Sequence, residues 1–190
     1  EVRHIQAAFS FHGGFNPERR LFSNALGGGA ILDVGGYPST MVRLVAGVAL
    51  GREYAEPLEL KGVGHIGTSR CDEWASAVAK FENGITAELS TGVSMAQDNA
   101  VRIYGSAGNI VIPTPWVPSR EGGTTKILLK KNAEKEVREI SIETSEWLYG
   151  IEADTVAAHL EGPAREGAKT GGGQGGPGAG RQAKFPAMSW

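Results

Sequence analysis

The sequence is poor in cysteine, in long apolar runs and in net charge, and each shortage excludes a class of protein. Its one cysteine, Cys71, cannot form an internal disulfide, which fits a reducing compartment and leads us to expect a cytoplasmic protein. No apolar run is long enough to cross a membrane as a helix. A formal net charge of −2 at pH 7, without a basic stripe, argues against nucleic-acid binding. We therefore expect neither a membrane nor a nucleic acid among its partners.

Metal-ligating and nucleophilic patterns are also missing from the sequence. The four histidines are far apart, and neither His-x-x-x-His nor Cys-x-x-Cys occurs. No serine lies in the nucleophile elbow that a hydrolase triad needs. We assign no metal site and no hydrolase centre.

The chain is long enough for one folded domain. Its 190 residues are 41% hydrophobic and 21% charged, as in ordinary globular proteins. After Gly162 the composition changes to glycine, proline, alanine and polar residues, which cannot bury enough apolar surface to become ordered. The sequence predicts a domain over residues 1–161 and a flexible, glycine-rich tail over residues 162–190. Because the first residue is glutamate and not methionine, we interpret the chain as a piece of a longer protein.

Short alternating segments predict a sheet. Between residues 73 and 93, two such segments flank Asn83-Gly84, the pair favoured in tight type I′ turns, and predict an antiparallel hairpin. Further strands are expected over residues 2–12, 58–68, 100–104, 109–112, 126–131 and 136–142, and helices over residues 28–46 and 145–161. These elements predict an α+β fold, in which a mostly antiparallel, open-faced sheet has helices packed on one face.

The segment from Gly62 to Gly67 matches the dinucleotide-binding pattern G-x-G-x-x-G. That pattern requires a helix that opens at its last glycine, so that the helix N-terminus meets the pyrophosphate. The residues after Gly67 alternate like a strand and do not predict a helix. We reject the match and assign no cofactor-binding residue to this chain.

The predicted helix over residues 28–46 carries the one catalytic pair that the sequence suggests. Asp33 and Tyr37 are four residues apart, so they share one helical face, directed out of the domain. A phenol can exchange a proton with a substrate hydroxyl, and a carboxylate one turn away can orient that substrate. The alternative is structural: a solvated or capping aspartate and a half-buried tyrosine.

Other residues of this segment predict its geometry. Pro38 should either kink the helix or make it restart there. The glycines over residues 27–29 permit a close backbone approach, either to a cofactor or to another strand. The apolar positions at helical spacing should face the core: Ile31, Val34, Met41 and Leu44.

Two further residues are candidates for substrate binding. Arg20 lies shortly before the glycines and could reach an anionic group near Gly27, although a surface arginine is the alternative. Trp116 lies between prolines in a segment that can be neither a regular strand nor a helix. It is either a hydrophobic plug or the wall of a substrate pocket.

The run Gly-Gly-Gly-x-x-x-Asp-x-Gly-x-Tyr-Pro, from Gly27 to Pro38, resembles the signature of the glucose–fructose oxidoreductase, inositol dehydrogenase and MocA family. In that family it lies near the start of the C-terminal domain. Four other stretches resemble later or earlier parts of the same domain in the same order: residues 1–6, 72–87, 102–112 and 149–152. The resemblance covers residues 1–161.

The resemblance implies an oxidoreductase domain whose open sheet face makes contacts in a homo-oligomer. It implies an active site shared with an N-terminal Rossmann domain, absent here, that holds NAD or NADP and supplies a catalytic lysine. The implied reaction transfers a hydride to or from a hydroxyl-bearing carbon of a sugar, polyol or diol. Tyr37 would be the proton donor or acceptor, and Asp33 would orient the substrate and the lysine. Tyrosine at this position resembles the dihydrodiol dehydrogenase and glucose–fructose oxidoreductase branches more than the inositol branch, and Trp116 resembles an aromatic wall of the substrate pocket in the dihydrodiol dehydrogenase branch. A non-catalytic domain that oligomerises through its sheet is the alternative.

Overall fold

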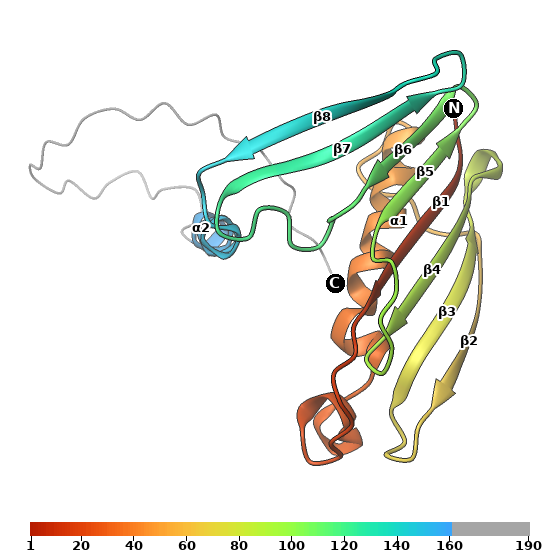
Figure 1. The fold of residues 1–190 in the computed structure, drawn as a ribbon. Helices are drawn as coiled ribbons and strands as arrows, with labels where there is room; N and C mark the ends of the chain where they lie inside the picture. The colour runs from red at the N-terminus through yellow and green to blue at the C-terminus, as the bar shows by residue number, and fades with distance from the viewer. Residues whose placement is uncertain (161–190) are drawn as a thin grey trace, which may run out of the picture.

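One eight-stranded sheet forms most of the fold (Figure 1). The computed structural model describes residues 1–160, so the predicted tail of residues 162–190 and the boundary at residue 161 lie outside the described residues. The strand order is β2-β3-β4-β1-β5-β6-β7-β8. β1 pairs in parallel with β4, and all other neighbours are antiparallel. The strands are β1 (Val2–Ser10), β2 (Glu59–Ile66), β3 (Asp72–Lys80), β4 (Thr86–Gly92), β5 (Val101–Gly105), β6 (Gly108–Ile112), β7 (Gly123–Lys131) and β8 (Val137–Thr144).

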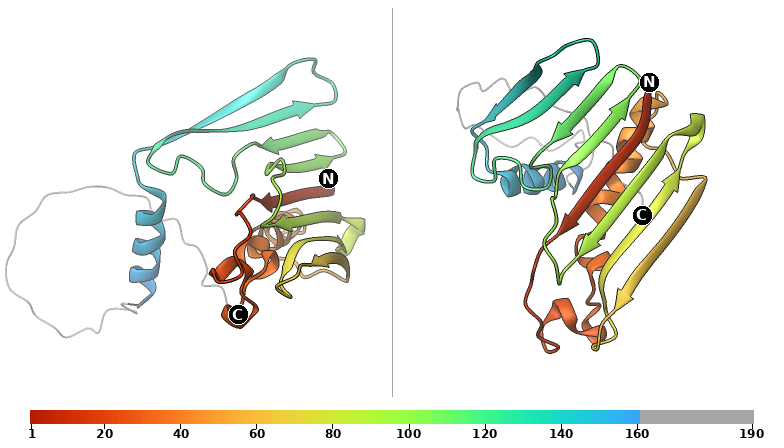
Figure 2. Two further views of the ribbon diagram at one scale, coloured as in Figure 1. Left: turned by 60° about the horizontal axis from the view of Figure 1, so that its bottom comes forward. Right: turned by 45° about the vertical axis from the view of Figure 1, so that its right-hand side comes forward.

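Two α-helices accompany the sheet. α1 (Gly36–Ala49) follows a π-helical turn (Ile31–Gly35) and packs on β1 and β4, along one face of the sheet (Figures 1 and 2). α2 (Leu148–Leu160) follows β8 and has no buried residue. No helix within residues 1–160 is long and apolar enough to cross a membrane. The predicted fold class, α+β with a mostly antiparallel open sheet, is confirmed, and α1 is the helix packed on its face.

The hairpin predicted between residues 73 and 93 is confirmed. β3 and β4 pair antiparallel, with Ala79 opposite Ala87. Asn83 (φ 55°) and Gly84 (φ 74°) both have positive φ, as the Asn-Gly pair predicts. The connection is one residue longer than a two-residue turn, because Phe81 N donates to Ile85 O at 2.7 Å across a loop of three residues.

The main core lies between α1 and the middle strands. α1 contributes a stripe with one residue every four, the spacing of side chains that lie above one another on a helix. The sheet contributes β-branched, aromatic and small side chains from β1, β3, β4, β5 and the hairpin loop. The buried residues of this cluster are Ile5, Ala7, Val42, Ala46, Ala55, Ala79, Phe81, Ile85, Ala87 and Val101.

The predicted core face of the catalytic helix is only partly correct. Val34 is buried and Met41 packs against the core, but Ile31 is 54% exposed and Leu44 is 37% exposed. The buried stripe consists of Val34, Pro38, Val42 and Ala46. Ile31 lies in the π-helical turn, whose wider winding shifts the side-chain phase relative to α1. Leu44 lies across α1 from Val42, and the prediction placed it on the wrong face.

The irregularity expected at Pro38 appears one turn earlier. The helical segment changes from π to α geometry at Gly35–Gly36, and Pro38 then lies inside α1 with its ring buried. Proline has no N–H to donate and its ring crowds the carbonyl four residues before it. A π-helical turn in front of Pro38 reroutes the hydrogen bonds at this point. The chain therefore continues as a helix instead of breaking at Pro38.

β2 contains the rejected dinucleotide pattern. Gly62 and Gly64 lie within this edge strand, paired with Ala77 and Ala75 of β3. After Gly67, a turn leads directly into β3, with Gly67 N donating to Cys71 O at 2.9 Å. A strand that pairs through its glycines presents no helix N-terminus to a pyrophosphate.

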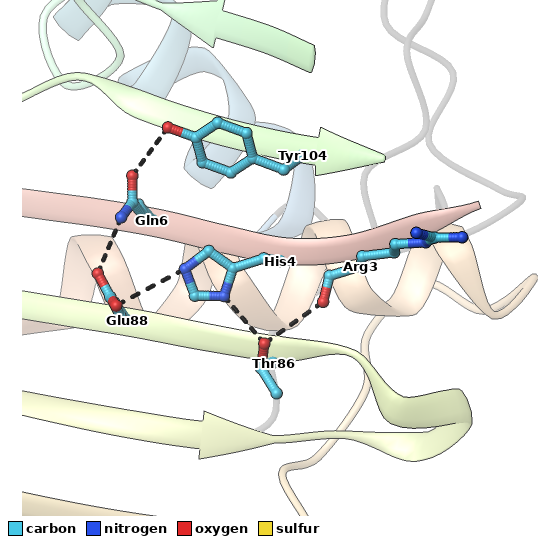
Figure 3. Close-up of polar contacts among 6 residues, drawn as sticks. All are labelled: Arg3, His4, Gln6, Thr86, Glu88 and Tyr104. Atoms are coloured by element: carbon cyan, nitrogen blue, oxygen red, sulfur yellow. Dashed lines mark hydrogen bonds and ion pairs between the residues drawn. The ribbon is translucent and has the colours of Figure 1, made fainter. Parts of the chain in front are cut away.

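The face of the sheet opposite α1 carries an ordered polar network (Figure 3). Tyr104 Oη donates to Gln6 Oε1 at 3.1 Å, and Gln6 Nε2 donates to Glu88 Oε2 at 2.9 Å. His4 lies 3.8 Å from the Glu88 carboxylate and hydrogen-bonds to Thr86 Oγ1 at 2.9 Å. We call the whole side of the sheet opposite α1, which also includes Val78 of β3, the open face. Its side chains bond to one another across three strands, which fixes their orientation.

Candidate active site

Asp33 and Tyr37 lie four residues apart on one continuous helical segment, at the edge between the core and solvent. Asp33 directly precedes Val34 and Tyr37 directly precedes Pro38. Because Val34 and Pro38 belong to the buried stripe, neither Asp33 nor Tyr37 points straight into the sheet. The Asp33 side chain is 13% exposed and Tyr37 is 49% exposed. A tyrosine buried against the sheet would have indicated a structural role, and Tyr37 is not buried.

Arg20 and Asp33 form an ion pair. Arg20 Nη1 lies 2.5 Å from Asp33 Oδ1. Arg20 begins a 3₁₀ turn that ends at Phe22, and Phe22 is buried against Ala30 in a second, small core. The pairing with Asp33 means that the positive charge of Arg20 is matched within the chain. The Arg20 side chain remains 63% exposed and accessible to a ligand.

The glycine run makes this pairing possible. Gly28 lies so close to the backbone of Arg20 that a Cβ atom at residue 28 would come within 2.6 Å of Arg20 O. Gly29, at φ 121°, lies closer still to the carboxylate of Asp72 at the start of β3. Of the two alternatives that the sequence left open, the close approach is therefore to other parts of the chain.

Tyr37 belongs to a cluster of three aromatic rings. Its ring meets Phe9 edge to face, with centroids 5.0 Å apart and an interplanar angle of 82°. It meets Trp116 in the same manner at 5.9 Å and 69°. Phe9 and Trp116 stack at 5.6 Å and 13°. Edge-to-face and offset-stacked rings are the favoured aromatic geometries, so the cluster holds the Tyr37 ring in a defined orientation.

Trp116 combines the two roles that the sequence left open. Its indole Nε1 donates to Ala8 O at 2.8 Å, and its ring packs against the main core. The same ring also faces Tyr37. The proline-rich loop after β6 therefore returns Trp116 to the end of β1, where it lines the surface around the phenol.

The structure thus brings the four predicted site residues into two contacting pairs, Arg20–Asp33 and Tyr37–Trp116, and Asp33 and Tyr37 lie four residues apart on one helical segment. Phe9, which joins the second pair, was missed by the sequence analysis. Phe9 lies two residues after Ala7 and four after Ile5 on β1, so it shares their face of the strand. This spacing would have indicated that Phe9 faces α1.

The chemistry open to this set is proton transfer and orientation. Among the described residues no side chain or backbone group hydrogen-bonds to the Tyr37 hydroxyl, so a substrate hydroxyl can take that place. Phenol, carboxylate, guanidinium and indole groups cannot take up a hydride, so a redox reaction would need a separate carrier. Within residues 1–160 no three His, Cys, Asp or Glu side chains gather to hold a metal.

Comparison with known protein families identifies the family of this chain. The model of the GFO/IDH/MocA C-terminal domain matches residues 1–111, a range that includes Arg20, Asp33 and Tyr37. The chain therefore belongs to the GFO/IDH/MocA family, as its C-terminal domain. Trp116 lies just beyond the matched range.

Individual relatives agree with this assignment. An uncharacterised oxidoreductase of Rhizobium meliloti is 31% identical over 119 residues, which are 63% of this chain and 34% of that protein. KijD10, a 3-ketoreductase from Actinomadura kijaniata solved with NADP and TDP-benzene, is 23% identical with a TM-score of 0.63, covering 87% of this chain and 48% of that one. An aldose-aldose oxidoreductase from Caulobacter crescentus, solved with glycerol, is 20% identical with a TM-score of 0.67, covering 84% of this chain and 45% of that one. The chain thus spans half or less of the length of these proteins, and the structural likeness shows their fold.

Proposed function

We propose that this chain is the C-terminal, substrate-binding part of an NAD(P)-dependent oxidoreductase. It would act on a hydroxyl-bearing carbon of a sugar, polyol or diol. The observation that carries the proposal is the half-exposed Tyr37 phenol, oriented by two aromatic rings and placed one turn from the Arg20–Asp33 pair.

In this proposal Tyr37 exchanges the proton of the reacting hydroxyl. Oxidation of a hydroxyl removes a hydride from carbon and a proton from oxygen, so a group that accepts the proton speeds the reaction. Asp33, held by Arg20, orients the substrate beside Tyr37. Trp116 provides a flat wall against which the apolar face of a sugar or diol ring can pack.

The residues present fit a nicotinamide cofactor held mainly by another domain. When bound, the nicotinamide supplies the hydride chemistry that these side chains lack. The glycine pattern of β2 is a paired strand, so it offers no phosphate-binding turn. The share of the relatives' length left unmatched supports a cofactor domain outside this chain. KijD10 was solved with NADP, which supports a nicotinamide dinucleotide as the cofactor.

The substrate class rests on the site and on the relatives. A neutralised arginine and an aromatic wall suit an uncharged, hydroxylated ring. A 3-ketoreductase and an aldose-aldose oxidoreductase among the relatives act in the same chemical class. We therefore favour sugars, polyols and diols.

The direct test uses the intact protein that contains this chain. NAD⁺ and NADP⁺ are each mixed with a panel of aldoses, polyols and cyclic diols, and NADH and NADPH with the matching ketones. The proposal predicts cofactor turnover with at least one member of the panel. A folded protein that turns over neither cofactor in either direction would contradict it.

The open face supports a second candidate, a domain that associates through its sheet. The face carries a pre-formed hydrogen-bond network and exposed apolar side chains such as Val78 at 55%. A homo-oligomer through this face is compatible with either candidate, because the face lies opposite α1. Association without any turnover would favour the second candidate alone.

A further inference from the structure

The helical segment that carries Asp33 and Tyr37 begins at Ala30, where its first N–H groups have no partner within the helix. Asp72, the first residue of β3, fills one of these places. Its Oδ2 accepts a hydrogen bond from Ile31 N at 2.7 Å. The carboxylate also lies at the positive end of the helix dipole, where a negative charge is favoured. A residue from the sheet, distant in sequence, therefore caps the segment two residues before Asp33.

The chain around Asp72 is shaped for this contact. Asn24 Nδ2 donates to Arg70 O at 3.0 Å, which ties the turn before β3 to the segment before the glycine run. Gly29 lies against the Asp72 carboxylate, and any side chain at this position would overlap it. The last glycine of the run thus makes room for the carboxylate.

A second tie reaches the same turn from β4. Thr91 Oγ1 donates to Ala30 O at 3.1 Å, and Thr91 is only 5% exposed. Asp72 accepts from the N–H of the Ala30–Ile31 peptide, and Thr91 donates to the C=O of the same peptide. The turn that follows is π-helical, a rare geometry that persists only where its surroundings hold it.

We propose that Asp72, with Thr91 as a second anchor, is a positioning residue for the active site. Asp72 holds the π-helical turn on the sheet. The position of this turn then determines the orientation of the Asp33 and Tyr37 side chains. We do not assign Asp72 a contact with the substrate or with Tyr37, and the inference rests on the proposed function of the Asp33–Tyr37 pair. A small displacement of an acid–base group costs turnover more than it costs ground-state binding.

The test compares variants of the intact protein. Asp72→Ala should lower kcat by roughly tenfold or more while leaving the Kd for the cofactor unchanged. Asp72→Asn should restore most of the turnover, because its amide oxygen can accept the same Ile31 N–H. Glu73→Ala is the matched control, since Glu73 neighbours Asp72 on β3 but accepts its hydrogen bond from Ser94 Oγ instead. It should keep kcat close to that of the wild type.

Hydrogen exchange gives a readout that does not depend on turnover. The amides over residues 31–37 should exchange faster in Asp72→Ala than in the wild type or in Glu73→Ala. If Asp72→Ala does not fold, Thr91→Val keeps the test open, because it is close in shape and removes only the bond to Ala30 O. It should show the same faster exchange and a several-fold loss of kcat.

Unchanged exchange over residues 31–37 in folded Asp72→Ala or Thr91→Val would overturn the proposal. So would faster exchange with an unchanged kcat. A wild-type protein without any turnover would instead refute the proposed function, and exchange alone would then decide whether Asp72 anchors the turn.

Discussion

At the scale of single residues, the Arg20–Asp33 pair connects structure with function. An exposed ion pair usually contributes about 1 kcal/mol or less to stability, because water screens it. Here the Asp33 side chain is 13% exposed while the Arg20 side chain is 63% exposed, so the pair orders a mostly buried carboxylate beside an accessible arginine. Its value lies in keeping Asp33 in place beside Tyr37.

Arg20→Ala should therefore affect catalysis more than folding. Without its partner Asp33 is free to rotate, and the proposed oxidoreductase should show a rise in substrate KM of roughly tenfold. Arg19→Ala is the matched control, because Arg19 is exposed and forms no ion pair within residues 1–160. Steady-state kinetics of the two variants in the intact protein checks this. Equal KM values for both would show that Arg20 does not hold the site.

At the scale of elements, local patterns and long-range contacts differ in how well the sequence predicts them. The β3–β4 hairpin was predictable, because alternation and the Asn83-Gly84 turn are local signals. The phase of the catalytic helix was not, because the π-helical turn interrupts the regular spacing from which Ile31 and Leu44 were assigned to the core. The hydrogen bond between Asp72 and Ile31 joins segments that are distant in the sequence, so no local sequence pattern predicts it.

Two valines on α1 test the observed phase. Val42 is 2% exposed and Val48 is 68% exposed. Val42→Ala removes buried methyl groups from the core and should lower the free energy of unfolding by about 2 kcal/mol. Val48→Ala should change it by less than about 0.5 kcal/mol. Urea denaturation of both variants measures the difference, and equal losses would contradict the observed helix phase.

The dependence of stability on acidic pH tests the contacts of Asp98, which lies in the short segment before β5. A side-chain hydrogen bond from Arg102 and a backbone hydrogen bond from Ala100 N, the latter at 3.2 Å, lower the pKa of Asp98 below its ordinary value. The contribution of Asp98 to stability is therefore fully present above the unfolded pKa of about 3.9 and is lost as pH falls through the lower folded pKa. The difference in unfolding free energy between wild type and Asp98→Asn should be constant at neutral pH and shrink below about pH 4. A difference that does not change with pH would contradict this.

At the scale of the whole molecule, the two faces of the sheet carry different features. One face carries α1, the core and the candidate active site, and the other carries the polar network of Figure 3. The sequence predicted this division from alternation within strands, because side chains on one face are spaced by two residues. It did not predict that β1 and β4 pair in parallel at the centre, since strand order depends on contacts far apart in the chain.

If the open face mediates association, a charge placed on it should weaken the oligomer. Val78→Lys sets a lysine beside Lys61, its cross-strand neighbour on β2. Val156→Lys is the matched control, on α2 and 58% exposed. Sedimentation of the intact protein should show dissociation for Val78→Lys alone. An unchanged mass for both variants would place any interface elsewhere.

The measurement that tests the central claim most directly is the turnover of Tyr37→Phe in the intact protein. Loss of a positioned acid–base group should lower kcat by roughly a hundredfold or more. The Kd for the cofactor should remain close to that of the wild type, because the phenol is not proposed to bind it. Tyr54→Phe, which changes a phenol outside the aromatic cluster, should keep wild-type turnover. If Tyr37→Phe matches the wild type with every sugar, polyol and diol that the wild type uses, Tyr37 is not the proton carrier.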